Sequence, residues 1–299
     1  MGRGKLRRWV SAAAAIAAVG IAGVGPGHAE TLDDGVFAPP GANDWRCVPT
    51  AAHPEPVVLV HGTWGNQSSW AELAPQLKAA GVCVFSLNYG RKRFSLRGSE
   101  PGVYGTADIR SSAKEIAAFV AQVRELTGAG RVDVVAHSQG GPLVRHYLRF
   151  EGGAQLGPAV RRLVTIAATH HGTTADGLGS LLPSGSAAAE ADTVIAKVLG
   201  TAAAQQLAGS EFLRRLNAAG DTEPGIAYTA IATRVDRVVT PPEATFLHAG
   251  PGATVDNRWV QDVCPTDTFH HGILPESPAV SYLVHQALDL PFDGTACPD

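Results

Sequence analysis

The sequence lacks a strong excess of charge of either sign. Lysine and arginine number 24, aspartate and glutamate number 27, and the formal net charge is −3. Four of the cations and none of the acids fall within residues 1–29, so the chain without this segment has a formal net charge of −7. A mildly acidic protein is a poor candidate for binding nucleic acid or an anionic membrane by charge. We therefore expect neither as a partner.

Cysteine is scarce, with four residues in the whole chain: Cys47, Cys83, Cys264 and Cys297. Their wide spacing argues against the paired Cys-x-x-Cys clusters of zinc sites. In an exported protein four cysteines indicate two disulfides, and a catalytic thiol is a poor alternative in an oxidising compartment. The sequence alone leaves three connectivities open. We favour Cys47–Cys83 with Cys264–Cys297, because each pair closes one end of the chain onto nearby core.

The first 29 residues are organised like a secretory signal peptide. The early cations precede an uncharged stretch of Ala, Val, Ile and Gly, and Gly27-His28-Ala29 is a small-residue cleavage site. The pair Arg7-Arg8 keeps twin-arginine export open beside the general route. A retained membrane anchor is the weaker alternative, because the stretch is dominated by Ala and Gly and ends at Pro26. We expect a secreted protein with a single domain over residues 30–299.

No internal repeat is visible after the leader, and strand-like segments alternate with helix-like ones. Short apolar runs predict buried strands within residues 56–62, 82–90, 131–138, 161–169, 226–235 and 253–264. Helices are expected over residues 68–81 and from Ile109 to near Gly128, where apolar residues recur in steps of four and three. This alternation predicts an α/β fold, with a mostly parallel central sheet and helices on both faces. In such a sheet the ligand crevice lies outside the carboxyl ends of the strands.

The stretch "VVAHSQGGPLV" places Ser138 between a predicted strand and a predicted helix. The pattern Ala136-His137-Ser138-Gln139-Gly140 is a nucleophile elbow, a turn so sharp that the residues two before and two after the serine must be small. The turn exposes the hydroxyl at a helix N-terminus, where a developing negative charge is favoured. We therefore predict that Ser138 is a catalytic nucleophile.

A serine hydroxyl is a weak nucleophile, so it needs a base that an acid orients, and in this kind of fold the order is Ser, Asp or Glu, His. Asp236 follows the late strand-like run that ends at residue 235, and we predict it as the acid. The next loop, "PTDTFHHGILPESPAV", offers His270 and His271 as the base. We choose His271, because Gly272 allows the tight loop that brings an imidazole over the sheet edge. His270 stays open as the alternative.

The remaining histidines near these motifs are expected to be structural. His137 adjoins the nucleophile but points to another side of the elbow, so we expect a packed residue at the strand end. His61 is expected to be a satisfied structural histidine. We expect His170 and His171 to shape the turn after a strand, with lining of the pocket as the lesser alternative.

Acyl transfer also needs an oxyanion hole, which two backbone N–H groups provide. The residue after the nucleophile, Gln139, is expected to give one of them. Thr63 in the run His61-Gly62-Thr63 is expected to give the other, since Gly62 lets the backbone approach closely. Trp64 is expected to form a wall of the substrate pocket.

At these motifs the chain resembles the secreted bacterial triacylglycerol lipases of the α/β-hydrolase superfamily. The resemblance rests on "PVVLVHGTWGNQSSW", "VDVVAHSQGGPLVRHYLRF", "TRVDRVVTPPEAT" and "VQDVCPTDTFHHGILPESPAV". It implies an α/β-hydrolase fold, a triad of Ser138, Asp236 and His271, and oxyanion donors at Thr63 and Gln139. Such families place a single histidine where this chain has the doublet, which leaves the base less secure than the nucleophile.

The predicted function is hydrolysis of carboxylic esters by a triacylglycerol lipase that forms an acyl-enzyme. A short-chain esterase, cutinase or polyester hydrolase is the alternative, an acyltransferase is a weaker one, and an inactive secreted binding protein of the same fold is the weakest. The expected partner is an ester or lipid substrate. The protein is expected to be a monomer. No cofactor is implied, and no metal is expected, since the sequence shows no dense acidic loop with calcium spacing. Residues 172–225 are expected to form either a cap over the acyl site or a plain helical excursion.

Overall fold

The computed structural model describes residues 36–298 apart from residue 156 and residues 175–185. The predicted signal peptide lies outside these described residues. Their six strands pair in the order β2-β1-β3-β4-β5-β6, and each neighbouring pair is parallel. The predicted α/β class with a parallel sheet is therefore confirmed. The strands are β1 (Val57–Val60), β2 (Val84–Ser86), β3 (Val132–His137), β4 (Val160–Ile166), β5 (Ala227–Ala232) and β6 (Thr254–Trp259).

Helices connect the strands and cover both faces of the sheet. The α-helices are α1 (Leu73–Ala79), α2 (Ile109–Thr127), α3 (Gly140–Phe150), α4 (Ser186–Val198), α5 (Thr201–Gln205), α6 (Glu211–Asn217), α7 (Val260–Val263) and α8 (Pro278–Ala287). Short 3-10 helices are η1 (Gln67–Trp70), η2 (Arg97–Ser99), η4 (Pro242–Thr245) and η5 (His271–Glu276). Among the described residues, no helix combines the length and the hydropathy needed to cross a membrane.

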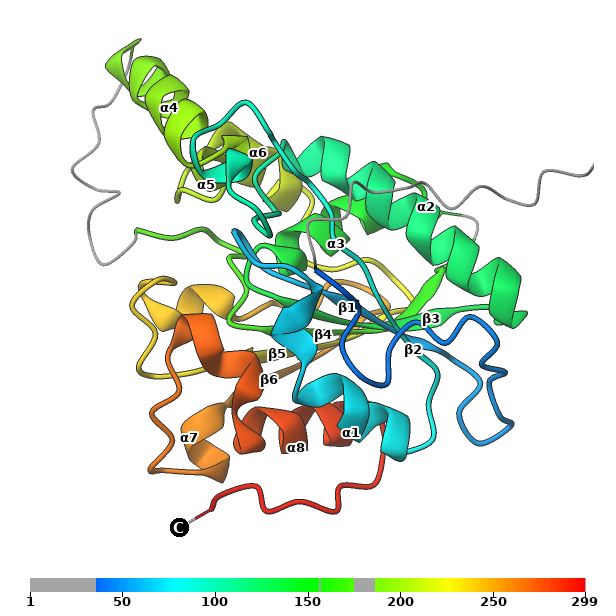
Figure 1. The fold of residues 1–299 in the computed structure, drawn as a ribbon. Coiled ribbons are helices and arrows are strands. Elements are labelled where there is room, and N and C mark those ends of the chain that lie inside the picture. Colours follow the sequence, from blue (N-terminus) through cyan, green and yellow to red (C-terminus); the bar gives the residue numbers. More distant parts are fainter. Residues whose placement is uncertain (1–35, 156, 175–185, 299) are drawn as a thin grey trace, which may run out of the picture. The chain divides into compact units, whose positions relative to one another are not determined.

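Two apolar cores lie on opposite faces of the sheet. Helices α2 and α3 pack on one face and α1 and α8 on the other (Figure 1). Alternation along β1 divides its side chains between them: Val58 and Val60 join the first core, and Val57 and Leu59 join the second. Burial on both faces explains why the strands read as continuous apolar runs in the sequence.

The structure shortens one of the two predicted helices. Instead of one helix over residues 68–81, η1 is followed by α1, which begins at Leu73. Pro75 explains the start of α1, because proline lacks an N–H and its ring clashes with the carbonyl four residues earlier, so it is tolerated only in a first turn. The second helix, α2, is confirmed from Ile109 to Thr127 and ends at Gly128, whose φ of 69° is left-handed.

Strand β2, at the edge of the sheet, is shorter than predicted. It pairs with β1 on one side. On the other side Ala42 bridges Val84, the Asn43 N–H donates to the Val84 carbonyl at 2.9 Å, and the Asn43 side chain bonds the backbone of Ser86. The Asn43 amide accepts from the Ser86 N–H (2.7 Å) and donates to the Ser86 carbonyl (2.9 Å). The backbone of this edge strand is thus satisfied without another strand. The predicted strand over 253–264 is likewise divided, into β6 and α7.

Both favoured disulfides are present. Cys47 bonds Cys83, which precedes β2, and Cys264 bonds Cys297 near the end of the chain. Each bridge closes one end of the described chain onto the sheet domain, as expected. No cysteine is free.

Candidate active site

Ser138 lies at a strained turn between β3 and α3. Its φ is 52°, a left-handed value that is uncommon for a residue with a side chain, and its N–H donates to the Ile166 carbonyl at 2.9 Å. A Cβ on Gly140 would lie 2.7 Å from the Val60 carbonyl oxygen and 3.2 Å from the Ala136 Cβ. Small residues at 136 and 140 are therefore required by contact, which is the physical reason for the pattern in the sequence.

The imidazole of His271 joins two residues that are far apart in the sequence. Its Nε2 lies 2.9 Å from Ser138 Oγ, and its Nδ1 lies 2.9 Å from Asp236 Oδ2. All three residues are buried, with Ser138 4%, Asp236 5% and His271 8% exposed. Such a chain of hydroxyl, imidazole and carboxylate can transfer the hydroxyl proton to the ring while the carboxylate stabilises the resulting imidazolium.

The carboxylate of Asp236 is held by its own loop. Its second oxygen, Oδ1, accepts the backbone N–H groups of Val238 at 2.7 Å and Val239 at 2.9 Å. These bonds leave Oδ2 directed at the His271 ring. The ring therefore meets an acceptor at Nδ1, and this favours the tautomer whose Nε2 lone pair faces Ser138.

His137 contacts the backbone of His271 rather than the reacting hydroxyl. Its Nε2–H donates to the His271 carbonyl at 2.9 Å, and the two rings are 5.1 Å apart. Burial lowers the pKa of His137 to about 3, so this ring stays neutral as a donor. His270, the alternative base, is exposed and lies at the N-cap of η5. The structure thus brings one residue of the doublet to Ser138.

Thr63 and Gln139, the predicted oxyanion donors, are joined through their side chains. Gln139 Nε2 donates to Thr63 Oγ1 at 3.1 Å and to the Gly105 carbonyl at 3.0 Å. Gly62 permits this closeness, because a Cβ there would lie 3.0 Å from the Cβ of Ser138. The backbone at Thr63, which follows β1, and the backbone at Gln139, which follows Ser138, are therefore fixed relative to each other.

Two further side chains support this pair. Gln206, which follows α5, donates through Nε2 to Thr63 Oγ1 at 2.8 Å. The Tyr89 hydroxyl donates to the His61 carbonyl at 2.7 Å and lies 3.2 Å from Gln139 Oε1. Neither residue was predicted, since Gln206 is 143 positions from its partner and no local motif surrounds it.

Comparison with known proteins gives the family. A family model described as lipase (class 2) matches residues 54–263, a segment that contains Ser138 and Asp236 and ends before His271. The chain belongs to the class 2 lipases. The predicted enzyme class, a lipase or esterase with a serine nucleophile, is the class of this family.

Solved structures support the same fold for this class 2 lipase. Lipase B of Aspergillus fumigatus is 19% identical over 83% of this chain, with a TM-score of 0.61, and the match spans 56% of the Aspergillus chain. The mature lipase BlEst2 of Bacillus licheniformis is 19% identical, with 82% of this chain and 96% of that chain covered and a TM-score of 0.55. At this identity the likeness shows the α/β-hydrolase fold, as predicted.

Three other residues considered in the sequence of this class 2 lipase, Trp64, His61 and His171, make contacts outside the Ser138–His271–Asp236 chain. Trp64 has a φ of 59°, is 39% exposed, and donates through Nε1 to the Leu199 carbonyl at 2.8 Å. His61 is fully buried, with Nδ1–H on the Gly62 carbonyl at 2.8 Å, as expected of a structural histidine. His171 does not reach Ser138; its ring contacts Asp221 instead.

Proposed function

We propose that this class 2 lipase hydrolyses carboxylic esters, with triacylglycerol as the substrate class, through an acyl-enzyme on Ser138. The observation that supports this most strongly is the single imidazole, His271, within 2.9 Å of both Ser138 Oγ and Asp236 Oδ2. In this mechanism His271 accepts the Ser138 proton as Oγ attacks the ester carbonyl. It then returns the proton to the leaving alcohol and activates a water for deacylation.

The negative charge of the tetrahedral intermediate would be held by the backbone N–H groups of Thr63 and Gln139. Thr63 Oγ1 accepts from two side-chain amides, those of Gln139 and Gln206. Its own hydroxyl proton is then free to serve as a third donor to the oxyanion. The fixed amides give this hydroxyl one orientation before substrate binds.

We also propose that residues 172–225, of which 175–185 lie outside the described residues, form a cap beside the acyl site, with Trp64 as part of the pocket wall. The support is two hydrogen bonds, from Trp64 to the Leu199 carbonyl and from Gln206 to Thr63. Two residues of the insertion therefore contact the oxyanion segment, which is residues 63–64. On α4, the side chains of Val194 and Val198 are 60% and 40% exposed. Such apolar surface suits a lipid substrate.

We also propose that the protein is secreted. Residues 1–29 have the pattern of a signal peptide, and two structural disulfides are typical of proteins in an oxidising compartment. We propose that the chain acts outside the cell as a monomer.

A fluorophosphonate probe tests the nucleophile, since it labels an activated serine. We expect labelling of the wild type and none of Ser138→Ala. If the folded wild type stays unlabelled, the enzyme mechanism is wrong. Rates on p-nitrophenyl esters of increasing acyl length, with and without an emulsion, then test the substrate class. A steep loss beyond butyrate without interfacial gain would reassign the chain to the short-chain esterases.

The histidine doublet provides a matched pair of variants. We expect His271→Ala to lower kcat by about 10⁴-fold or more, because the hydroxyl loses its base. His270→Ala, at the exposed neighbouring position, is expected to keep kcat within about threefold, since surface changes rarely alter a site. Circular dichroism checks that both variants are folded. The reverse ranking would move the base to His270.

A further inference from the structure

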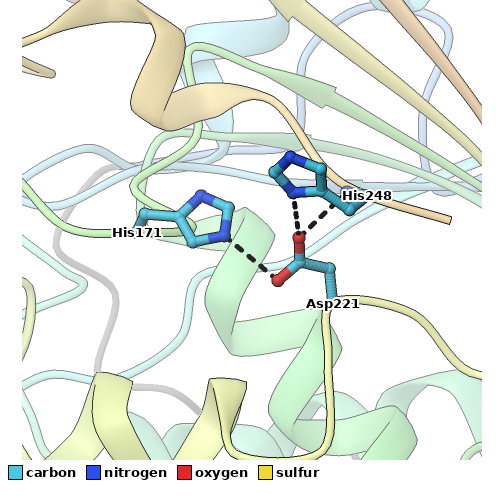
Figure 2. A group of neighbouring side chains, drawn as sticks. All are labelled: His171, Asp221 and His248. Atoms are coloured by element: carbon cyan, nitrogen blue, oxygen red, sulfur yellow. Dashed lines mark hydrogen bonds and ion pairs between the residues drawn. The ribbon is translucent and has the colours of Figure 1, made fainter. Parts of the chain in front are cut away.

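We infer that His171, Asp221 and His248 form a binding site for one divalent transition-metal ion, Zn²⁺ being the natural candidate. The three side chains converge from separate segments of the chain (Figure 2). His171 Nε2 lies 3.0 Å from Asp221 Oδ1, and His248 Nδ1 lies 3.1 Å from Asp221 Oδ2.

The donor set determines which metal class fits. Two imidazole nitrogens and a carboxylate oxygen lie within 4.8 Å of one another. Zinc is commonly held by His and Asp or Glu with a water as the fourth ligand, whereas Ca²⁺ takes six to eight oxygen ligands. Imidazole ligands favour zinc, copper, nickel and iron over calcium and magnesium.

The ring of His171 is oriented as in a metal ligand. Its Nδ1–H donates to the Ala244 carbonyl at 3.1 Å, and metal-binding histidines usually make such a bond with the second ring nitrogen. With Nδ1–H held by Ala244, Nε2 is the ring atom that faces Asp221 Oδ1. Without a metal, a proton joins these two atoms in a hydrogen bond, and a bound metal ion would take the place of that proton.

The carboxylate of Asp221 is fixed in place from the protein side. Oδ2 accepts the backbone N–H of His248 at 2.9 Å, and the Asp221 carbonyl accepts from Arg145 Nε at 2.7 Å. The Arg145 guanidinium is also 3.6 Å from Oδ1 and offsets part of the carboxylate charge. The carboxylate is therefore already positioned for a metal ion before one binds.

The site is open on one side. Asp221 is 8% exposed, whereas the side chains of His171 and His248 are 31% and 90% exposed. The two rings are 6.3 Å apart and inclined at 69°. A metal ion can therefore enter from solvent. His171 and Asp221 would hold it first, and a small movement of the exposed His248 ring would add the third protein ligand. A water can complete the coordination.

A bound metal would tie together three segments that flank the loop of Asp236. His171 follows β4, Asp221 follows α6, and His248 follows η4, which begins after that loop. The His171 N–H also donates to the Ala244 carbonyl at 3.3 Å. We expect the ion to stabilise this side of the domain without taking part in ester cleavage.

Equilibrium dialysis of the full, tag-free chain tests the site. The protein is treated with EDTA, dialysed against ZnCl₂ and analysed for metal by mass spectrometry. We expect one Zn²⁺ per chain in the wild type and in His270→Gln, an exposed histidine outside the cluster. Loss of the bound Zn²⁺ is expected in His171→Gln and in His248→Gln, whose exposed side chain makes the substitution mild for folding. Fluorophosphonate labelling confirms that each variant is folded.

Two further readouts separate a site from adventitious binding. Zn²⁺ at about 100 times its Kd should raise the wild-type Tm by roughly 5 °C and leave that of His248→Gln unchanged, while Ca²⁺ should change neither. Co²⁺ in place of Zn²⁺ should give visible d–d absorption that His248→Gln lacks. Absence of Zn²⁺ binding by the wild type, or equal binding by His248→Gln, overturns the inference.

Discussion

At the scale of the residue, the chain of Ser138, His271 and Asp236 depends on contacts that reach beyond the local motif around each residue. Ser138 was predicted from its small neighbours, and contacts of Gly140 with Val60 and Ala136 give that pattern its cause. The sequence gives a weaker basis for choosing between His270 and His271 than it gives for predicting Ser138. Adjacent side chains diverge, and which one meets Ser138 depends on a loop whose path is set by tertiary contacts such as the bond from His137.

Asp236→Asn tests the orientation of the base. Asn can still accept the N–H groups of Val238 and Val239 through its carbonyl oxygen, so its amide NH₂ would face His271 Nδ1. His271 then accepts at Nδ1 and carries its proton on Nε2, where it can no longer take the proton of Ser138. We expect kcat to fall by about 10³- to 10⁴-fold with little change in KM.

The pH profile of this variant provides the control. Its residual rate should rise with pH, as hydroxide replaces the missing base, while its unfolding midpoint in urea stays near that of the wild type. A kcat within tenfold of the wild type would show that Asp236 does not orient the base.

At the scale of the element, the parallel sheet and α2 were predictable because burial on both faces and a helical apolar stripe leave strong local patterns. The late start of α1 and the early end of β2 were not. The first depends on where Pro75 can be tolerated. At the end of β2 the Ser86 backbone is satisfied by Asn43, a long-range contact 43 positions away in the sequence. The link from the insertion to the oxyanion segment, Gln206 to Thr63, is long-range for the same reason.

Gln206→Leu tests that link. Loss of the donor leaves Thr63 Oγ1 with one amide partner, so the hydroxyl and the adjoining N–H should be less well ordered toward the oxyanion. We expect kcat to fall about tenfold, in line with the loss of one neutral hydrogen bond, and KM to change little, because the oxyanion exists only beyond the ground state.

Gln205→Leu is the matched control within the same segment. Its side chain accepts the Ile109 N–H at 2.8 Å and makes no contact with Thr63 that would align it. We expect it to lower the unfolding free energy while kcat stays within about twofold. Equal losses of kcat in both variants would indicate a general disturbance of α5 and would contradict a positioning role for Gln206.

At the scale of the whole molecule, buried histidines connect the fold to pH. Burial lowers the pKa of His61 to about 4 and of His137 to about 3, and it also lowers the pKa of His170. In the unfolded chain these groups return to about 6.5 and bind more protons below that pH. Their contribution to stability is therefore complete above pH 6.5 and is lost progressively as the pH falls from about 6.5 to the folded values. His171, whose pKa is raised by Asp221, acts in the opposite sense.

His61→Gln tests this acid sensitivity away from the reacting atoms. His61 donates from Nδ1 to the Gly62 carbonyl and accepts the Tyr89 N–H at Nε2 (3.4 Å), so a second proton on the ring has no acceptor there. With a folded pKa of about 4, this one residue should account for about 2 kcal/mol of the unfolding free energy lost between pH 7.5 and pH 5. Urea denaturation at both pH values measures the loss, and we expect it to be smaller by that amount in the variant. The variant should also be less stable than the wild type at pH 7.5, because it loses the stacking of the His61 ring on Tyr89. An unchanged pH dependence would mean that His61 is not held neutral by burial.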